Sequence, residues 1–235
     1  MARKSALSVI SPSTGIAQDG LSRTSVVYER LRQDLLNGDL KAGDKLAVAS
    51  LSQRYAFGAS PVREALSRLS SEGLVEQIDQ RGFRAAALDF AELPLLTQTR
   101  CELESLALRQ SIALKSKAWE DTLVIIVHHL AKTPRSLSAE SYVRNPVWED
   151  LHGQFHTALI ANCSSRWLRQ FCNTLTGEAF RFRQVAASKS YAKRDEHSEH
   201  MALFQASIEG NADQAVALLQ AHYQRTSVLT SQAAG

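Results

Sequence analysis

The stretch SPVREALSRLSSEGLV, residues 60–75, predicts a helix with a defined beginning and end. Ser60 is a good N-terminal cap, and Pro61 occupies the first helical position, where its missing N–H costs nothing. Gly73 is expected to end the helix. Apolar residues recur along one face at Val62, Ala65, Leu66 and Leu69. One face of this helix is therefore expected to pack on a core, and the other to meet solvent.

The segments on either side complete a small domain. SVVYERLRQDLLNGDL (25–40) has apolar residues near helical spacing, KAGDKL (41–46) is a turn, and VASLSQRYAF (48–57) is a short helix. LVEQI (74–78), the turn DQRG and FRAAAL (83–88) predict a two-stranded hairpin. Three helices and a hairpin are the pattern of a winged helix-turn-helix, although short helical pairs also occur in ordinary helical domains.

In a winged helix, the second helix of the helix-turn-helix enters the DNA major groove by its N-terminal end. Ser60, Arg63 and Ser67 project away from the apolar stripe of that helix. An arginine fork matches both a guanine edge and a phosphate, although exposed arginines are usually just solvated. At the tip of the wing, the candidates for backbone or minor-groove contact are Arg81, Gly82 and Arg84.

The charge distribution points to the same region. The net charge of the 235-residue chain is only +3, so composition alone does not announce a nucleic-acid binder. Up to Leu88 the sequence has 12 Lys and Arg and 9 Asp and Glu, and after Leu88 it has 15 of each kind. The whole positive excess therefore lies in the first part of the chain.

Other features bear on the compartment. The longest apolar run, TLVIIVHHL, is too short to span a membrane and contains His128 and His129. Residues 1–21 are expected to be a flexible leader, not a signal peptide. Three cysteines without CxxC spacing fit a reducing cytoplasm better than a disulfide framework.

The remainder of the chain predicts an all-α bundle, which makes the protein mainly α. After a linker at 89–92, residues 93–230 show no strand-like alternation. The domain boundaries are therefore placed at 22–88 for the winged helix and 93–230 for the bundle. About six helices are expected, at 91–114, 118–132, 145–163, 165–188, 193–210 and 213–229.

Four histidines of this bundle have compatible positions. In HGQFH, His152 and His156 are four residues apart and share a helix face. The turn EGNAD (209–213) has a glycine that stops one helix and an aspartate expected to cap the next. His200 lies ten residues before that glycine and His222 nine after that aspartate, so both are level, roughly 15 Å from the turn. If all four face inward, they suit zinc, nickel, copper or another divalent ion.

Two alternatives stay open at this point. The chain has seven histidines, so compatible positions can arise by chance, and a lone histidine on an amphipathic helix is usually a satisfied boundary residue. A metalloenzyme would need a placed general base, but HGQFH lacks the glutamate of HExxH. There is also no GxSxG elbow and no phosphate-binding glycine loop, so the chain is not expected to be an enzyme.

GDLKAGDKL, SPVREALSRLSSEGLV and RGF are similar, in order and spacing, to the winged-helix domain of the GntR family of bacterial transcription regulators. The resemblance covers roughly residues 22–88 and implies binding to double-stranded operator DNA. One position departs from the family pattern, because Ala59 stands where an arginine is usual. Its base or phosphate contact must be absent or supplied elsewhere.

RCELES, FHTALIANCSS and the C-terminal histidines resemble the helical effector domain of the FadR branch, the FCD type, over roughly residues 92–228. The resemblance implies a divalent metal, zinc or nickel, held by an aspartate and a histidine one turn apart and two later histidines. Here these are His156, His200 and His222, while His152 replaces the aspartate. That replacement makes the site less anionic by one charge.

The resemblance also implies an effector and a mode of regulation. The chain is expected to be a homodimeric repressor whose metal site binds a small organic acid and so alters operator binding. A purely structural metal, or none, is the alternative. The run CSSRWL…FRFR resembles a sub-branch that responds to carbon starvation and dicarboxylates such as glutarate. The candidate carboxylate clamps are Arg100, Arg181 and Arg183, unless these pair with glutamates at a surface.

Overall fold

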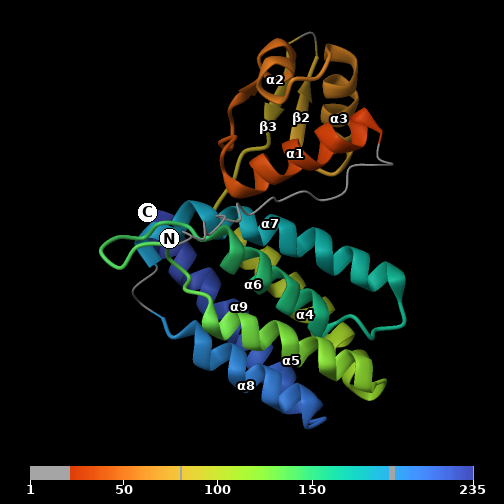
Figure 1. The fold of residues 1–235 in the computed structure, drawn as a ribbon, viewed down its shortest axis with the longest axis vertical. Helices are drawn as coiled ribbons and strands as arrows, with labels where there is room; N and C mark the ends of the chain where they lie inside the picture. The colour runs from red at the N-terminus through yellow and green to blue at the C-terminus, as the bar shows by residue number, and fades with distance from the viewer. Residues whose placement is uncertain (1–21, 80, 191–193, 235) are drawn as a thin grey trace, which may run out of the picture. The chain divides into compact units, whose positions relative to one another are not determined.

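A computed structural model describes residues 22–79, 81–190 and 194–234 of the chain (Figure 1). The leader expected at residues 1–21 lies outside the described residues. The chain divides into two compact units, residues 1–33 with 45–85, and residues 34–44 with 86–235. No described helix is long and apolar enough to cross a membrane.

The first unit holds the predicted winged helix. Its elements are α1 (Arg23–Asn37, reaching into the second unit's range), β1 (Lys45–Leu46), α2 (Val48–Tyr55), α3 (Ala59–Ser71), β2 (Val75–Ile78) and β3 (Gly82–Ala85). The apolar stripe of α3 is buried as expected, with Val62, Ala65, Leu66 and Leu69 all at 0% exposure. These side chains fix which face of α3 is left outward.

Two local predictions for this unit were wrong. The helix α3 begins at Ala59, and its N-cap is Gly58 in extended conformation, so Ser60 lies inside the first turn and caps nothing. Pro61 is still tolerated there, because the first four N–H groups of a helix have no intrahelical partner. The segment expected to be only a turn also contains β1, which pairs antiparallel with β3 and makes the sheet three-stranded in the order β1-β3-β2.

The predicted hairpin is confirmed. Val75 pairs with Ala85 and Ile78 with Gly82 in an antiparallel register. Gly82 has a φ of +90°, a conformation that strains any residue with a side chain, so this position at the turn favours glycine.

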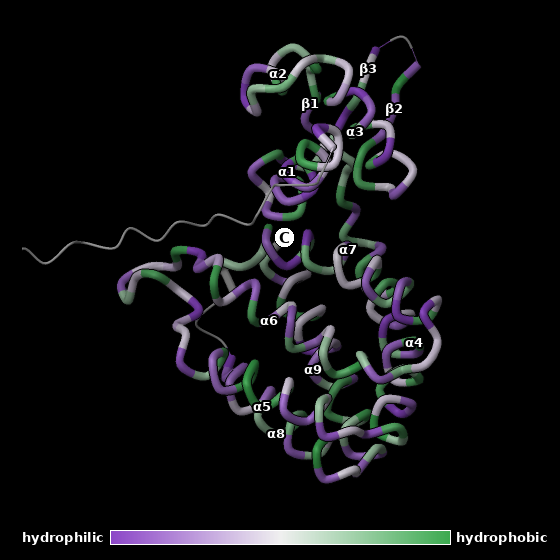
Figure 2. Tube along the Cα trace, turned by 45° about the vertical axis from the view of Figure 1, so that its right-hand side comes forward, coloured by the Kyte–Doolittle hydropathy of each residue, from purple (hydrophilic) through white to green (hydrophobic). Residues whose placement is uncertain are grey.

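The second unit is the expected all-α bundle. Its six helices among the described residues are α4 (Leu93–Ala113), α5 (Lys117–Lys132), α6 (Pro146–Leu159), α7 (Arg166–Ser190), α8 (Glu196–Ile208) and α9 (Ala212–Ala234). The helix α9 packs against α4, α7 and α8, and α5 packs against α6 and α8. Along these helices hydrophobic and hydrophilic residues alternate (Figure 2), as amphipathic helices require.

The ends of the helices show which caps the sequence identified correctly. Asn145 caps α6 by accepting a hydrogen bond from the N–H of Val147, and Pro146 follows at the first position, both as expected. Asp213 does not cap α9. That helix begins one residue earlier, and Asn211 accepts the hydrogen bond from the N–H of Gln214. Asp213 lies in the first turn instead.

Candidate metal centre and DNA-contact surface

The candidate DNA-contact residues all lie on the exposed surface of the first unit. On α3 they are Ser60, Arg63 and Ser67, and on the wing they are Arg81, Gly82 and Arg84. Tyr28 of α1 fixes the position of α3, because its hydroxyl donates its proton to the carboxylate of Glu72, whose two oxygens lie 2.8 and 2.9 Å away. The guanidinium of Arg68 lies 3.7 Å from the centre of the Tyr28 ring. These contacts hold the C-terminal end of α3, the helix that would read DNA, against α1.

The second unit brings the four predicted histidines together. His152 and His156 come from α6, His200 from α8 and His222 from α9. One ring nitrogen of each lies within 4.8 Å of the others. The Nε2 atoms of His152 and His156 are 3.2 Å apart, and the ring centres of His200 and His222 are 4.8 Å apart. The helices α8 and α9, on either side of the tight turn, therefore place His200 and His222 level with each other, as the sequence predicts.

The cluster is buried and uncharged. None of its four histidines is more than 9% exposed. Burial lowers the pKa of His152, His156 and His200 well below the usual value, and lowers that of His222 to about 4, although Glu199 opposes this. Neutral imidazole is the form that binds metal. His200 Nε2 is buried without a hydrogen-bond partner among the described residues, and buried polar atoms in proteins rarely lack one unless a bound ion or water satisfies them.

A second layer of polar residues holds two of these rings. Glu199 Oε2 lies 2.9 Å from Nδ1 of His222, and Glu199 is held by Arg194 and by Arg225. The nearby guanidinium of Arg194 also donates to the backbone oxygen of His222, at 3.0 Å. Although burial raises it, the pKa of Glu199 is lowered overall by its hydrogen bonds with His222 and Arg194.

On the other side of the cluster, the hydroxyl of Tyr223 lies 3.2 Å from Nδ1 of His156 and donates to Glu104 Oε2 at 2.5 Å. Burial and the neighbouring Glu104 raise the pKa of Tyr223 well above its usual value. Glu104 Oε1 also accepts from Nε of Arg100 at 2.8 Å. His152, in contrast, is oriented by packing, since its ring stacks on Trp148 with centres 4.8 Å apart and planes 11° apart.

A small cavity adjoins three of the histidines. His152, His156 and His222 line it together with Arg100 and Arg183, and its volume is about 60 Å³. Both arginines are buried and ion-paired, Arg100 with Glu104 and Arg183 with Glu149. An organic acid larger than a few atoms would therefore need these side chains to move apart.

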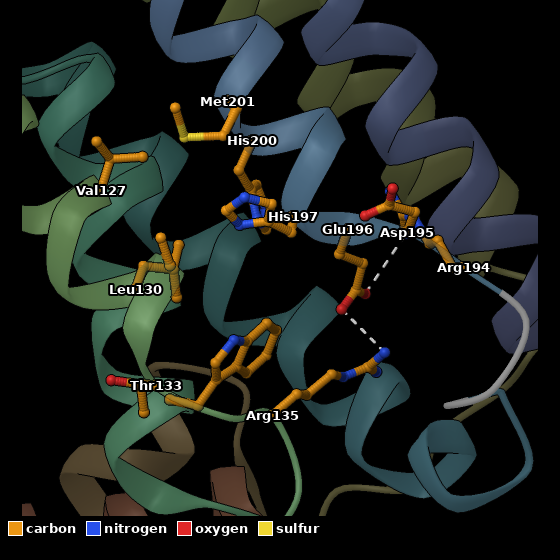
Figure 3. A pocket seen from close by; sticks show the side chains of 12 residues that line it. Val127, Leu130, Thr133, Arg135, Arg194, Asp195, Glu196, His197, His200 and Met201 are labelled. Atoms are coloured by element: carbon orange, nitrogen blue, oxygen red, sulfur yellow. Dashed lines mark ion pairs between the residues drawn. The ribbon is translucent and has the colours of Figure 1, made fainter.

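A larger cavity lies against the remaining histidine, His200 (Figure 3), with a volume of about 430 Å³. Two arginines point toward Glu196 there, Arg135 at 2.9 Å and Arg194 at 3.8 Å. Across from them, Val127 and Leu130 of α5 form an apolar wall. The arginines of both cavities are ion-paired with glutamates, so charge does not distinguish the cavities. The smaller one differs in that three of the four histidines line it, against one in the larger.

The third candidate clamp, Arg181, lies elsewhere. It is buried, but it does not line the cavity beside the histidines. It donates to Glu178 Oε2 at 2.9 Å and to the backbone oxygen of Ala86 at 2.5 Å. The pairing with a glutamate considered from sequence is thus what the structure shows for Arg181.

Sequence reasoning missed the second layer around the histidines. The glutamate partners of the arginines were expected at a surface, yet Glu104, which pairs with Arg100, is 2% exposed. Its spacing of four residues from Arg100 was a usable signal, because such pairs meet on a helix. Tyr223 and Glu199 stand directly beside His222 and His200 in the sequence, but nothing in a neighbouring position predicts a contact with a ring on another helix.

Comparison with known proteins agrees with this arrangement. Residues 23–84 match the family described as bacterial regulatory proteins, gntR family, and residues 95–225 match the FCD domain. The HTH-type transcriptional regulator BphR of Paraburkholderia xenovorans is 36% identical over 206 residues, covering 86% of this chain and 82% of the relative. The HTH-type transcriptional repressor GlaR of Escherichia coli is 30% identical, covering 83% and 90%.

Among solved structures, E. coli McbR/YncC has the same fold, with a TM-score of 0.75 at 19% identity, and covers 92% of this chain and 100% of that one. These matches define a class, the winged-helix regulators that carry an all-α effector domain. The chain belongs to the GntR family, in its FadR-like branch with an FCD domain. It is a DNA-binding transcription regulator, as its relatives are, and not an enzyme.

Proposed function

We propose that this regulator is a repressor that holds a divalent metal ion at its four histidines and releases DNA when a small organic acid binds beside them. The observation that carries the proposal is the convergence of four buried imidazoles within 4.8 Å. Its similarity to the repressor GlaR supports the sign of regulation.

The donor set fits a metal ion. Zinc–nitrogen bonds of about 2.0–2.1 Å place tetrahedral ligand atoms about 3.3 Å apart, so the cluster needs only a modest contraction to close on an ion. The unpartnered Nε2 of His200 gains a partner in that arrangement. His152, His156, His200 and His222 would hold zinc or nickel, and the bound ion would supply positive charge and, by expanding to five or six ligands, a position for a carboxylate oxygen.

Arg100 and Arg183 are the proposed clamps for the acid. Both line the cavity that three of the histidines share, and each already binds a glutamate carboxylate. Because a guanidinium fork recognises any carboxylate, an acid entering this cavity meets groups suited to its charge. A dicarboxylate such as glutarate, the class expected from the sequence, has one carboxylate for the ion and one for an arginine.

On the DNA side, the exposed face of α3 and the wing would bind the operator. Arg63 is suited to a base edge, and Ser60 and Ser67 flank it on the same helix. Arg81, Gly82 and Arg84 would contact the DNA backbone or minor groove. A homodimer would present two such surfaces to a near-palindromic operator.

Metal content is the first test. Untagged protein, purified without a metal column, is measured by mass spectrometry beside His156→Ala and the matched control His129→Ala, which removes an exposed histidine of the same bundle. We expect about one ion per chain in the wild type and the control, and a loss in His156→Ala. Absence of metal from all three would make the four histidines polar core residues.

The effector is tested on DNA. A duplex selected by the protein from random sequences is bound in the presence of the ion, and small mono- and dicarboxylates are added. Release by an acid, weakened in Arg100→Gln, supports the proposal. An ion whose removal unfolds the bundle, with DNA binding that no acid changes, would instead indicate a structural metal.

A further inference from the structure

We infer that Glu104 and Tyr223 form a positioning relay that fixes the proton of His156 on Nδ1 and leaves Nε2 as its ligand atom. The relay joins α4 to α9 and ends on α6, so three helices determine the state of one imidazole. The inference deepens the proposed metal site, on which its second test rests.

The direction of the hydrogen bonds follows from counting protons. A phenol has one proton to donate, and Tyr223 lies 2.5 Å from Glu104 Oε2 but 3.2 Å from His156 Nδ1. A carboxylate can only accept, and Glu104 also accepts from Arg100 and from the hydroxyl of Thr176, at 2.8 and 3.4 Å. The phenolic proton therefore goes to Glu104, and the phenolic oxygen accepts the proton of His156 Nδ1.

The contact on the far side of the ring is consistent with this direction. With its proton on Nδ1, His156 has a lone pair on Nε2, which faces His152 Nε2 at 3.2 Å. In the metal-free protein His152 then donates from its own Nε2. His156 is thus ready to bind a metal, whereas His152 must move its proton to Nδ1 first.

His222 has a different environment at the same ring atom. Glu199 Oε2 and the guanidinium of Arg194 each lie 2.9 Å from Nδ1 of His222. A carboxylate that only accepts and a guanidinium that only donates compete for this nitrogen, so these contacts do not fix its proton as Tyr223 fixes that of His156.

In the relay, Tyr223 stands between the carboxylate of Glu104 and the ring of His156, and Arg100 contacts both Glu104 and Tyr223. The guanidinium of Arg100 binds Glu104 and also lies 4.0 Å from the centre of the Tyr223 ring. An acid held by Arg100 would therefore lie against the relay.

The first test needs no metal. Histidine tautomers are read from long-range ¹H–¹⁵N correlation spectra of ¹⁵N-labelled, chelator-treated protein, with His156 assigned by its loss in His156→Ala. We expect the Nδ1–H form in the wild type and a shift toward the Nε2–H form in Tyr223→Phe. Arg100→Gln should shift it less, because the bond from Tyr223 to Glu104 is left in place. An Nε2–H form in the wild type, or no change in Tyr223→Phe, would overturn the relay.

The second test is metal affinity, measured by competition with a chelator. We expect Tyr223→Phe to bind zinc about 10–100-fold more weakly. The matched control is Tyr28→Phe, which removes another tyrosine–glutamate hydrogen bond, in the winged helix and far in sequence from any histidine. Equal weakening in both variants would mean a general folding effect and would overturn the relay. If neither the wild type nor the variant binds zinc, the proposed metal site is refuted. The tautomer measurement of the first test then decides alone whether the relay exists.

Discussion

In the winged-helix unit the candidate functional residues stand on the surface over an apolar core, whereas in the helical unit they are part of the core. Arg63 on α3 is exposed, while Leu66 on the same helix is 0% exposed. In the bundle, His200 and Glu104 are each only 2% exposed. A surface site can change with little effect on stability, but a buried polar site determines whether its domain is stable. The following predictions test that difference.

Acid should destabilise the helical unit most. In chelator-treated protein, His222 has a pKa of about 4 when folded and about 6.5 when unfolded, so the unfolded chain binds more protons as the pH falls. The stabilisation is complete above pH 6.5 and is lost as the pH falls through about 4. His222 alone accounts for a loss of ~3 kcal/mol, and the other three histidines add to it.

Tryptophan fluorescence during urea unfolding measures this loss, because Trp119, Trp148 and Trp167 all belong to the helical unit. The winged helix contains no histidine in its sequence, so its amide signals should show no such dependence between pH 6.5 and 4. Parallel loss in both units would contradict the comparison.

Glu149→Ala should have the next largest effect. It leaves the guanidinium of Arg183 buried without its carboxylate, which destabilises by about 3–5 kcal/mol. The midpoint of urea unfolding, followed by fluorescence, measures it. Asp150→Ala is the control, because Asp150 is the exposed neighbour on the same helix and should change the midpoint little. Equal effects would show that burial is not the cause.

Arg63→Ala should weaken DNA binding without affecting folding. We expect a loss of about 1–3 kcal/mol on the selected duplex, measured by fluorescence anisotropy, with stability unchanged within about 0.5 kcal/mol. If Arg63→Ala weakens binding equally to all DNA sequences and makes the affinity less dependent on salt concentration, Arg63 contacts a phosphate and not a base. A variant that binds DNA normally would remove Arg63 from the interface.

The smallest effect belongs to a surface ion pair of the bundle. Arg109 and Asp213 are 2.6 Å apart, but their side chains are 47% and 88% exposed. Asp213→Ala should change the free energy of unfolding by less than about 1 kcal/mol, measured in the same urea experiment. A loss as large as that of Glu149→Ala would contradict the rule that buried charges dominate here.

Much of the fold could be predicted because long amphipathic segments leave a strong periodic signal. The six helices of the bundle and the hairpin at Val75–Ala85 are examples. The strand β1 could not be predicted, because two residues are too few to show alternation of apolar and polar side chains. Its pairing with β3 also depends on residues about 40 positions away in the sequence. The start of α3 was misplaced because serine before proline is a strong cap signal, yet the backbone of Gly58 takes the capping position.

For the site, the histidines could be predicted and their supports could not. Helical spacing and a tight turn place His152 beside His156 and His200 level with His222, which needs only local geometry. The contact from Tyr223 to His156 joins residues 67 apart in sequence, and no periodicity encodes it. Which of several arginines would reach the cavity also depended on helix rotation, which sequence fixes only loosely.

The stacking of Trp148 on His152 gives this protein a built-in optical reporter. Excited-state indole loses its emission readily to a paramagnetic ion a few ångströms away, whereas a closed-shell ion such as zinc has no such pathway. Titration with nickel or copper should therefore dim the emission of Trp148, whereas titration with zinc should leave it undimmed. The indole that packs on His152 would thus report, without any label, whether an added ion at the proposed site is paramagnetic or closed-shell.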